Sequence, residues 1–207
     1  MYAMSTSNAG AAKTRPGKAD GYHHGNLSVA LVEAGIGLLE ESESADFSLR
    51  EAARRVGVTV NACYRHYANK EALMAAISAE GFRRFAKALQ EGAEEGGTPR
   101  QRLLGSGRAY VAFARHHPAL FRLMFGTFSA AQRGADVIEA SQRSFRVLKS
   151  GIAAVMDKDI EAAEVAAGAL RAWSMAHGLS FLVLDGQLGA QPQSVDQIIH
   201  QVLSSWE

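Results

Sequence analysis

The residues best suited to chemistry in this 207-residue chain lie between positions 48 and 70. Small or hydrogen-bonding side chains stand in a row there, namely Thr59, Val60, Asn61 and Ala62. On a helix that enters the major groove of DNA, Asn61 could pair with an adenine and Val60 could contact a thymine methyl. Other side chains of the stretch can reach phosphates, which position a protein without reading sequence. These are Arg50, Tyr64, Arg65, His66 and Lys70.

The charge of the chain is unevenly distributed. The whole sequence has 22 Lys and Arg against 21 Asp and Glu, a net charge of +1, which by itself argues against a nucleic-acid partner. Residues 48–70, however, hold five basic residues and one acid, Glu51, whereas residues 159–207 hold six acids and one base, Arg171. The total therefore hides a basic segment with a local charge of +4 and an acidic one of −5, and this polarity supports a polyanionic partner for the basic segment.

The elements that must position these residues are two short helices joined by a tight turn. Ser48 and Glu51 match a capping box at the start of the first helix. Gly57 can take the positive φ that ends it, and Thr59 can cap a second helix that runs to about Tyr67. This pattern predicts a helix-turn-helix, although plain helical hairpins share the spacing.

The rest of the chain predicts an all-α fold of about nine helices. Residues 1–20 have the composition of a disordered tail whose basic residues could touch a polyanion. Residues 21–75 form the predicted DNA-binding domain, and residues 76–207 a larger helical domain for ligand binding and dimerisation. In the second domain, Gly92 to Gly97 should break the long helix opened by Lys70, and Pro118 should start a short helix.

The stretch from Ser48 to Leu73 resembles the DNA-binding domain of the TetR family of bacterial regulators. The resemblance covers residues 22–75 and is carried by the Gly57-Val58 turn, the Tyr64-x-x-Tyr67 end of the second helix, and Asn-Lys-Glu-x-Leu at 69–73. It implies a homodimeric, ligand-responsive transcription factor, most often a repressor. Tyr64 and Lys70 then occupy phosphate-contact positions and residues 59–62 the base-reading ones. The chain departs from the family at Asn61, where a smaller residue is common, and at Cys63, where Leu is usual.

Two later stretches are similar to one subgroup, whose regulatory domain carries a Trp-His-Gly signature. They are 110–118 with Leu120-Phe121, and Trp173-Ser-Met-Ala-His177-Gly178-Leu. Residues 22–27 often accompany that subgroup. The resemblance implies a regulatory domain that binds a small molecule.

Aromatic, methionine and histidine side chains at helical spacing could line a ligand cavity in this domain. Trp173 and His177 lie one turn apart on one stripe, and the simpler interpretation is that both belong to the core. The candidate lining residues are Phe82, Phe85, Tyr110, Phe113, His117, Phe121, Met124, Phe125, Phe145, Trp173, Met175 and His177.

Residues 165–184 contain a single charge, Arg171. Their length would allow a membrane span, but Arg171, Ser174, His177 and Ser180 argue against it. A helix that is apolar on nearly every side can meet its own core on one face and a second subunit on the other. With the final helix it predicts a four-helix dimer interface at Leu179, Val183, Ile198, Val202 and Trp206.

Other kinds of chemistry have weaker support in the sequence. The single cysteine, Cys63, excludes an intramolecular disulfide and reads as a small buried thiol rather than a redox switch. His23-His24 and His116-His117 are adjacent pairs, which point about 100° apart on a helix and do not suit a metal. We therefore expect no metal and no cofactor.

Two alternative functions remain open. An all-helical enzyme would use Ser174, His177 and Asp185, but no nucleophile elbow or phosphate loop accompanies them. An architectural DNA-binding protein would keep the helix-turn-helix and need no cavity. The favoured expectation is a cytoplasmic repressor, not an enzyme, that binds a palindromic double-stranded operator as a homodimer. A small apolar or amphipathic effector would release it from DNA, with no membrane partner.

Overall fold

A computed structural model describes residues 27–42, 46–126, 134–189 and 194–204. Over these ranges the chain forms nine α-helices and no strands, as predicted. They are α1 (Leu27–Glu41), α2 (Leu49–Val56), α3 (Val60–Tyr64), α4 (Lys70–Glu94), α5 (Pro99–His116), α6 (Pro118–Phe125), α7 (Ala135–Met156), α8 (Ala163–Leu184) and α9 (Val195–Ser204). The predicted tail at 1–20, the motif at 22–26 and Trp206 lie outside the described residues.

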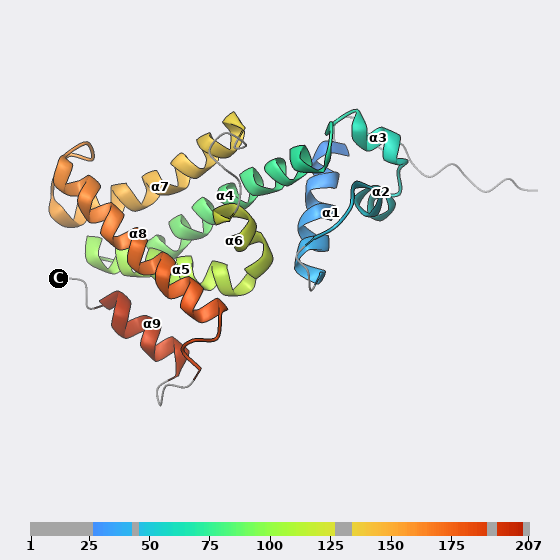
Figure 1. The fold of residues 1–207 in the computed structure, drawn as a ribbon. Coiled ribbons are helices and arrows are strands. Elements are labelled where there is room, and N and C mark those ends of the chain that lie inside the picture. The colour runs from blue at the N-terminus through green and yellow to red at the C-terminus, as the bar shows by residue number, and fades with distance from the viewer. Residues whose placement is uncertain (1–26, 43–45, 127–133, 190–193, 205–207) are drawn as a thin grey trace, which may run out of the picture.

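Helices α1, α2 and α3 gather at one end of the molecule, and α4 runs from them into the middle of the larger helical part (Figure 1). The buried side of α4 carries an apolar residue at almost every turn, including Leu73, Ile77, Phe85 and Leu89. Its first turns contact α1, and its later turns contact α5, α6 and α7. The predicted domain boundary at 75–76 therefore falls inside one continuous helix.

The predicted break between Gly92 and Gly97 is present, because α4 ends at Glu94 and α5 begins at Pro99. Gly92 has a packing role inside the helix. A Cβ on Gly92 would lie 2.7 Å from the carbonyl oxygen of Gly105, and a Cβ on Gly105 would lie 2.1 Å from that of Gly92. The two glycines let α4 and α5 approach closely where they meet.

The larger part is built around α4 and α5, with α7 and α8 on them and α9 against α5 and α8 (Figure 1). Its ends follow ordinary capping rules: Thr98 and Gln101 form a capping box at α5, where Pro99 is the first residue, and Ser194 and Gln197 exchange the same bonds before α9. Within the described ranges, no helix joins the length and the hydropathy that crossing a bilayer requires.

Candidate DNA interface and ligand cavity

The turn between α2 and α3 has the geometry that the sequence predicts. Ser48 Oγ accepts from the backbone N–H of Glu51 at 3.2 Å, while Glu51 Oε2 accepts from the N–H of Ser48 at 2.7 Å. Gly57 has φ 76° and ψ 28°, and the N–H of Val58 donates to the carbonyl of Ala53 at 3.0 Å. This left-handed C-cap aims the chain into α3, whose first turn is capped by Thr59 Oγ1. The helix itself ends at Tyr64, earlier than predicted.

Helix α3 presents its predicted base-reading face to solvent. Asn61, Arg65 and His66 are exposed, and Tyr64 is 52% exposed although it is a large aromatic residue. Thr59 is also exposed, while Val60 and Ala62 are half-buried. An exposed tyrosine and asparagine on a short helix beside basic residues form a surface able to contact phosphates and base edges.

The opposite side of α3 holds it in place. Cys63 is fully buried, as expected for a structural thiol, and burial raises its pKa. Tyr67 Oη donates to the backbone carbonyl of Ser28 on α1 at 3.2 Å. Helix α3 therefore packs on α2 through its buried side, and the segment that follows it is tied to α1 by Tyr67, while the outer face of α3 stays available.

The predicted phosphate contacts differ in their surroundings. Arg50 is exposed on α2, and Arg54 on the same helix is exposed with no ion pair among the described residues, which the sequence prediction missed. Lys70 begins α4 and forms an ion pair with Asp46, which no motif indicated. The Lys70 ammonium, by donating to the carboxylate, lowers the pKa of Asp46, so this acid is ionised beside the predicted DNA-facing surface.

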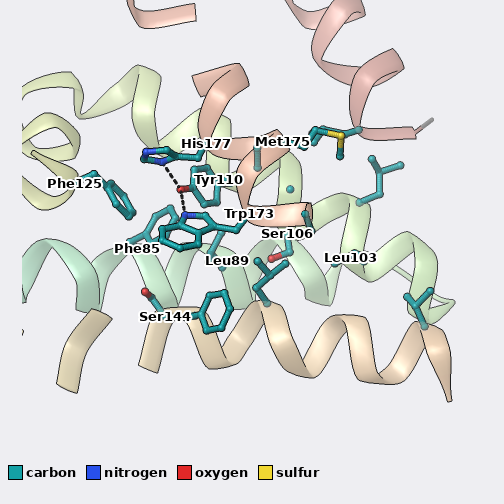
Figure 2. Close-up of a pocket in the computed structure, with 18 of the residues that line it drawn as sticks. Phe85, Leu89, Leu103, Ser106, Tyr110, Phe125, Ser144, Trp173, Met175 and His177 are labelled. Carbon is teal, nitrogen blue, oxygen red and sulfur yellow. Dashed lines mark hydrogen bonds between the residues drawn. The ribbon is translucent and has the colours of Figure 1, made fainter. Parts of the chain in front are cut away.

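A cavity of about 580 Å³ lies in the larger part of the molecule (Figure 2). Its walls come from α4 to α9 and are mainly apolar and aromatic, a composition typical of small-molecule sites. Eight of the predicted residues line it: Phe82, Phe85, Tyr110, Phe125, Phe145, Trp173, Met175 and His177. The sequence prediction missed several others, among them Leu89, Leu103, Ser106, Ser144 and Leu203.

Four predicted lining residues do not border this cavity. Phe113, Phe121 and Met124 are buried in the core, with Phe121 fully enclosed by neighbouring rings. His117 is half-buried at the junction of α5 and α6. Apolar periodicity marks which residues are buried, but it does not separate those that meet other side chains from those that meet empty space.

A hydrogen-bonded chain of three side chains stands at one end of the cavity (Figure 2). Trp173 Nε1 donates to Tyr110 Oη at 3.1 Å, and Tyr110 Oη lies 3.0 Å from His177 Nδ1. Since an indole can only donate, Tyr110 Oη accepts from Trp173, and its own proton is available to Nδ1 of a neutral His177 that carries its proton on Nε2. Burial supports this arrangement, because it lowers the pKa of His177 and raises that of Tyr110.

Helix α6 connects the cavity to the DNA-binding end. The carboxylate of Glu40, on α1, accepts from the N–H groups of Ala119 and Leu120 at 3.3 and 3.1 Å. These are the first available donors of α6, since Pro118 has none. Phe125 at the other end of α6 borders the cavity. The α6 helix therefore touches both a DNA-domain helix and the cavity.

The residues of the enzyme alternative are engaged with other partners. Ser174 Oγ donates to the carbonyl of Leu170 at 2.9 Å, and Asp185 is paired with Arg122. His177 bonds to Tyr110, so the three do not form a catalytic arrangement. Throughout the described part of the chain, no three His, Cys, Asp or Glu side chains come together in a way that could hold a metal ion.

The predicted dimer residues are only partly at the surface. Leu179 is buried within the chain, while Val183, Ile198 and Val202 are half-buried. The exposed apolar residues of α8 are Leu170 and Leu182, at 55% and 45% exposure. Ser174 and Gly178 lie between them at steps of four residues and are also exposed. The outward face of α8 therefore carries small or apolar residues at these four positions.

Two family profiles match this chain. The profile described as bacterial regulatory proteins, tetR family, matches residues 31–77. The profile described as tetracyclin repressor-like, C-terminal domain, matches residues 103–205. The chain belongs to the TetR family. It is accordingly a TetR-type DNA-binding transcriptional regulator, with an N-terminal helix-turn-helix and a C-terminal helical domain.

Solved structures agree with this TetR assignment. A protein of unknown function from Rhodococcus sp. RHA1 is 31% identical, with a TM-score of 0.77 over 90% of this chain and 96% of that one. A TetR/AcrR-family regulator from Thermobifida fusca YX-ER1 is 14% identical, with a TM-score of 0.61 over 88% and 99%. The regulator FadR from Bacillus subtilis, in complex with stearoyl-CoA, is 14% identical, with a TM-score of 0.64 over 84% and 95%. The latter two share the fold. No curated relative matches with significance.

Proposed function

We propose that this TetR regulator is a cytoplasmic, ligand-responsive repressor that binds a palindromic operator as a homodimer. The observation that carries the proposal is the presence, in one chain, of an exposed α3 and a cavity of about 580 Å³. An architectural DNA-binding protein would need no such cavity. The Trp173-x-x-x-His177-Gly178 sequence at this cavity supports membership of the Trp-His-Gly subgroup.

On DNA, residues 59–62 would read base edges and five other side chains would contact phosphates: Arg50, Tyr64, Arg65, His66 and Lys70. Two subunits would present their α3 helices about 34–36 Å apart, to successive major grooves of one face of the duplex. A ligand in the cavity would favour a second arrangement of the dimer, in which this spacing is lost. The stearoyl-CoA bound to FadR supports the view that this fold can accommodate a small molecule.

A mobility-shift assay on the DNA upstream of the protein's own gene tests the proposal. We expect a discrete complex that survives an excess of unrelated DNA of equal length. Equal binding to both DNAs would contradict sequence-specific regulation.

Lys70→Ala tests the phosphate role within the same assay. Loss of one phosphate contact per subunit, two per dimer, should weaken binding to every sequence and lower the slope of log K against log salt by about two. Asp46→Asn is the matched partner: it removes the carboxylate that pairs with Lys70 and should strengthen DNA binding. If neither substitution changes the affinity or the salt slope, Lys70 does not contact phosphate.

A further inference from the structure

A second hollow adjoins the aromatic cavity and has a different chemical character. This groove, of about 750 Å³, lies between α4, α5 and α7. Four side chains border both hollows, namely Leu103, Ser106, Gln142 and Leu148. The groove also carries three guanidinium groups and one carboxylate, from Arg102, Arg143, Arg146 and Glu139. An apolar hollow and a cationic one thus share a wall that is half polar.

The aromatic cavity is elongated. Its lining on α7 runs from Ser141 to Val155, which is about 21 Å of helix at about 1.5 Å per residue. On α5 the lining runs from Arg100 to Tyr110, about 15 Å on the same basis. The shape therefore favours an extended apolar ligand over a compact one.

The positive charge beside the cavity is concentrated and only partly neutralised. Residues 99–158 contain ten Lys and Arg against three Asp and Glu. Several of these bases pair with the acidic C-terminal part of the chain, as in Arg115–Asp196 and Lys149–Glu161.

Arg143 and Arg146 differ, because neither guanidinium group has an ion pair or a hydrogen bond among the described residues. Arg102 donates to the carbonyls of Gly96 and Gly97, and Glu139 offsets one of the three charges in the groove. Arg143 and Arg146 stand three residues apart on α7, so both guanidinium groups can reach one anion.

Ser106 lies where the two hollows meet. The residue is only 6% exposed, and it borders both hollows. Figure 2 shows its side chain beside Leu89 and Trp173 at the cavity wall. A hydroxyl at this passage can donate to, or accept from, a polar atom of a ligand that spans both hollows.

We propose that the ligand of this cavity is an amphipathic anion. Its single extended apolar tail would occupy the aromatic cavity, and its carboxylate or phosphate would lie against Arg143 and Arg146, with Ser106 and Gln142 at the passage between them. This inference rests on the proposed function, since such a ligand would be the effector that releases DNA. Beyond the proposed function, it specifies the charge and the shape of that effector.

Isothermal titration calorimetry with decanoate, decyl phosphate, decanol and decyltrimethylammonium on the full chain tests the inference. One or two charge-assisted hydrogen bonds should make decanoate bind about tenfold to a hundredfold more tightly than decanol. The double variant Arg143→Gln/Arg146→Gln should lose this preference and keep the decanol affinity, which also shows that it is folded. Lys87→Gln, an exposed charge that lines neither hollow, is the matched control and should behave as the wild type.

The outcomes separate the possibilities. Tighter binding of decyl phosphate than of decanoate would support the inference and indicate a phosphate head group. Tighter binding of decanoate would support it and indicate a carboxylate head group. Equal binding of decanoate and decanol, preference for the cationic probe, or no binding of any probe would overturn it. The proposed function fails separately: a wild-type protein that does not shift its upstream DNA contradicts that proposal, whatever calorimetry shows.

Discussion

Tyr110 Oη accepts the indole N–H of Trp173, and its own proton can be donated to Nδ1 of His177. We expect His177 to carry its proton on Nε2, and Tyr110→Phe to remove this preference. Long-range ¹H–¹⁵N spectra of the ring nitrogens distinguish the tautomers. Trp173→Phe is the control, since it keeps the phenolic donor and should keep the Nε2–H form. A wild-type ring protonated on Nδ1 would contradict the proposed direction of the bonds.

Burial of His177 also predicts a pH dependence. Its pKa lies below the ordinary 6.5, so on acidification the unfolded chain takes up a proton before the folded one does. The contribution of neutral His177 to the free energy of unfolding is therefore complete above pH 6.5, and it is lost as the pH falls toward the lower pKa of the folded state. Denaturation at several pH values should show stability falling below pH 6.5, less steeply in His177→Asn. Equal slopes would show that His177 titrates as it does in water.

Gly57 is the residue on which the helix-turn-helix geometry depends most directly. Its φ of 76° is strained for a residue with a Cβ, although no neighbour lies within 4 Å of where a Cβ would be. We expect Gly57→Ala to destabilise the protein by about 1–2 kcal/mol and Gly57→Asn to cost less, because asparagine tolerates the left-handed region. Urea denaturation measures both. An alanine variant as stable as the wild type would show that the turn can relax.

The caps and the turn were predictable because their partners lie within three to five residues in the sequence. Ser48, Gly57 and Thr59 are examples, and their bonds are as expected. The pairing of Lys70 with Asp46 was not predictable, since it depends on how the segment before α2 approaches the start of α4. The cavity was predictable only as a set of apolar residues, and the lining serines carry no apolar signal at all.

Among the elements, α6 is the one whose position depends on a distant residue. Its N-terminus is capped by Glu40 from α1, about eighty positions earlier, and so no local pattern reveals the bond. We expect Glu40→Gln to lower stability by about 1 kcal/mol, since one charged cap to two N–H groups is lost. Hydrogen exchange at the amides of Ala119 and Leu120 should accelerate.

The control for this change is Glu91→Gln, which removes an exposed carboxylate from α4 that pairs with Lys87 at the surface. It should leave the exchange of both α6 amides unchanged. Unchanged exchange in Glu40→Gln as well would mean that α6 is held by its apolar contacts alone, such as those of Met124 and Leu120 beside Gly81.

At the scale of the whole molecule, the uneven charge seen in the sequence acquires a spatial meaning. The basic segment at 48–70 forms the end that carries α3, while acids of the C-terminal segment neutralise bases of α5 and α6, as in Arg115–Asp196 and Arg122–Asp185 (Figure 1). Much of the acidic segment therefore serves internal pairing. The near-zero net charge is compatible with DNA binding because the two groups of charges act at different places.

We expect the outward face of α8 to form the interface through which two such molecules present their basic ends to one duplex. Leu170 and Leu182 are exposed there, with Ser174 and Gly178 between them, and a second copy would bury this face. We expect Leu182→Glu to place a charge in that interface and give a monomer by sedimentation equilibrium. It should also lose tight operator binding, since a single α3 contacts only a half-site. Ile138→Glu, at an exposed apolar residue of α7, is the control and should remain dimeric. A Leu182→Glu protein that stays dimeric would place the interface on another face.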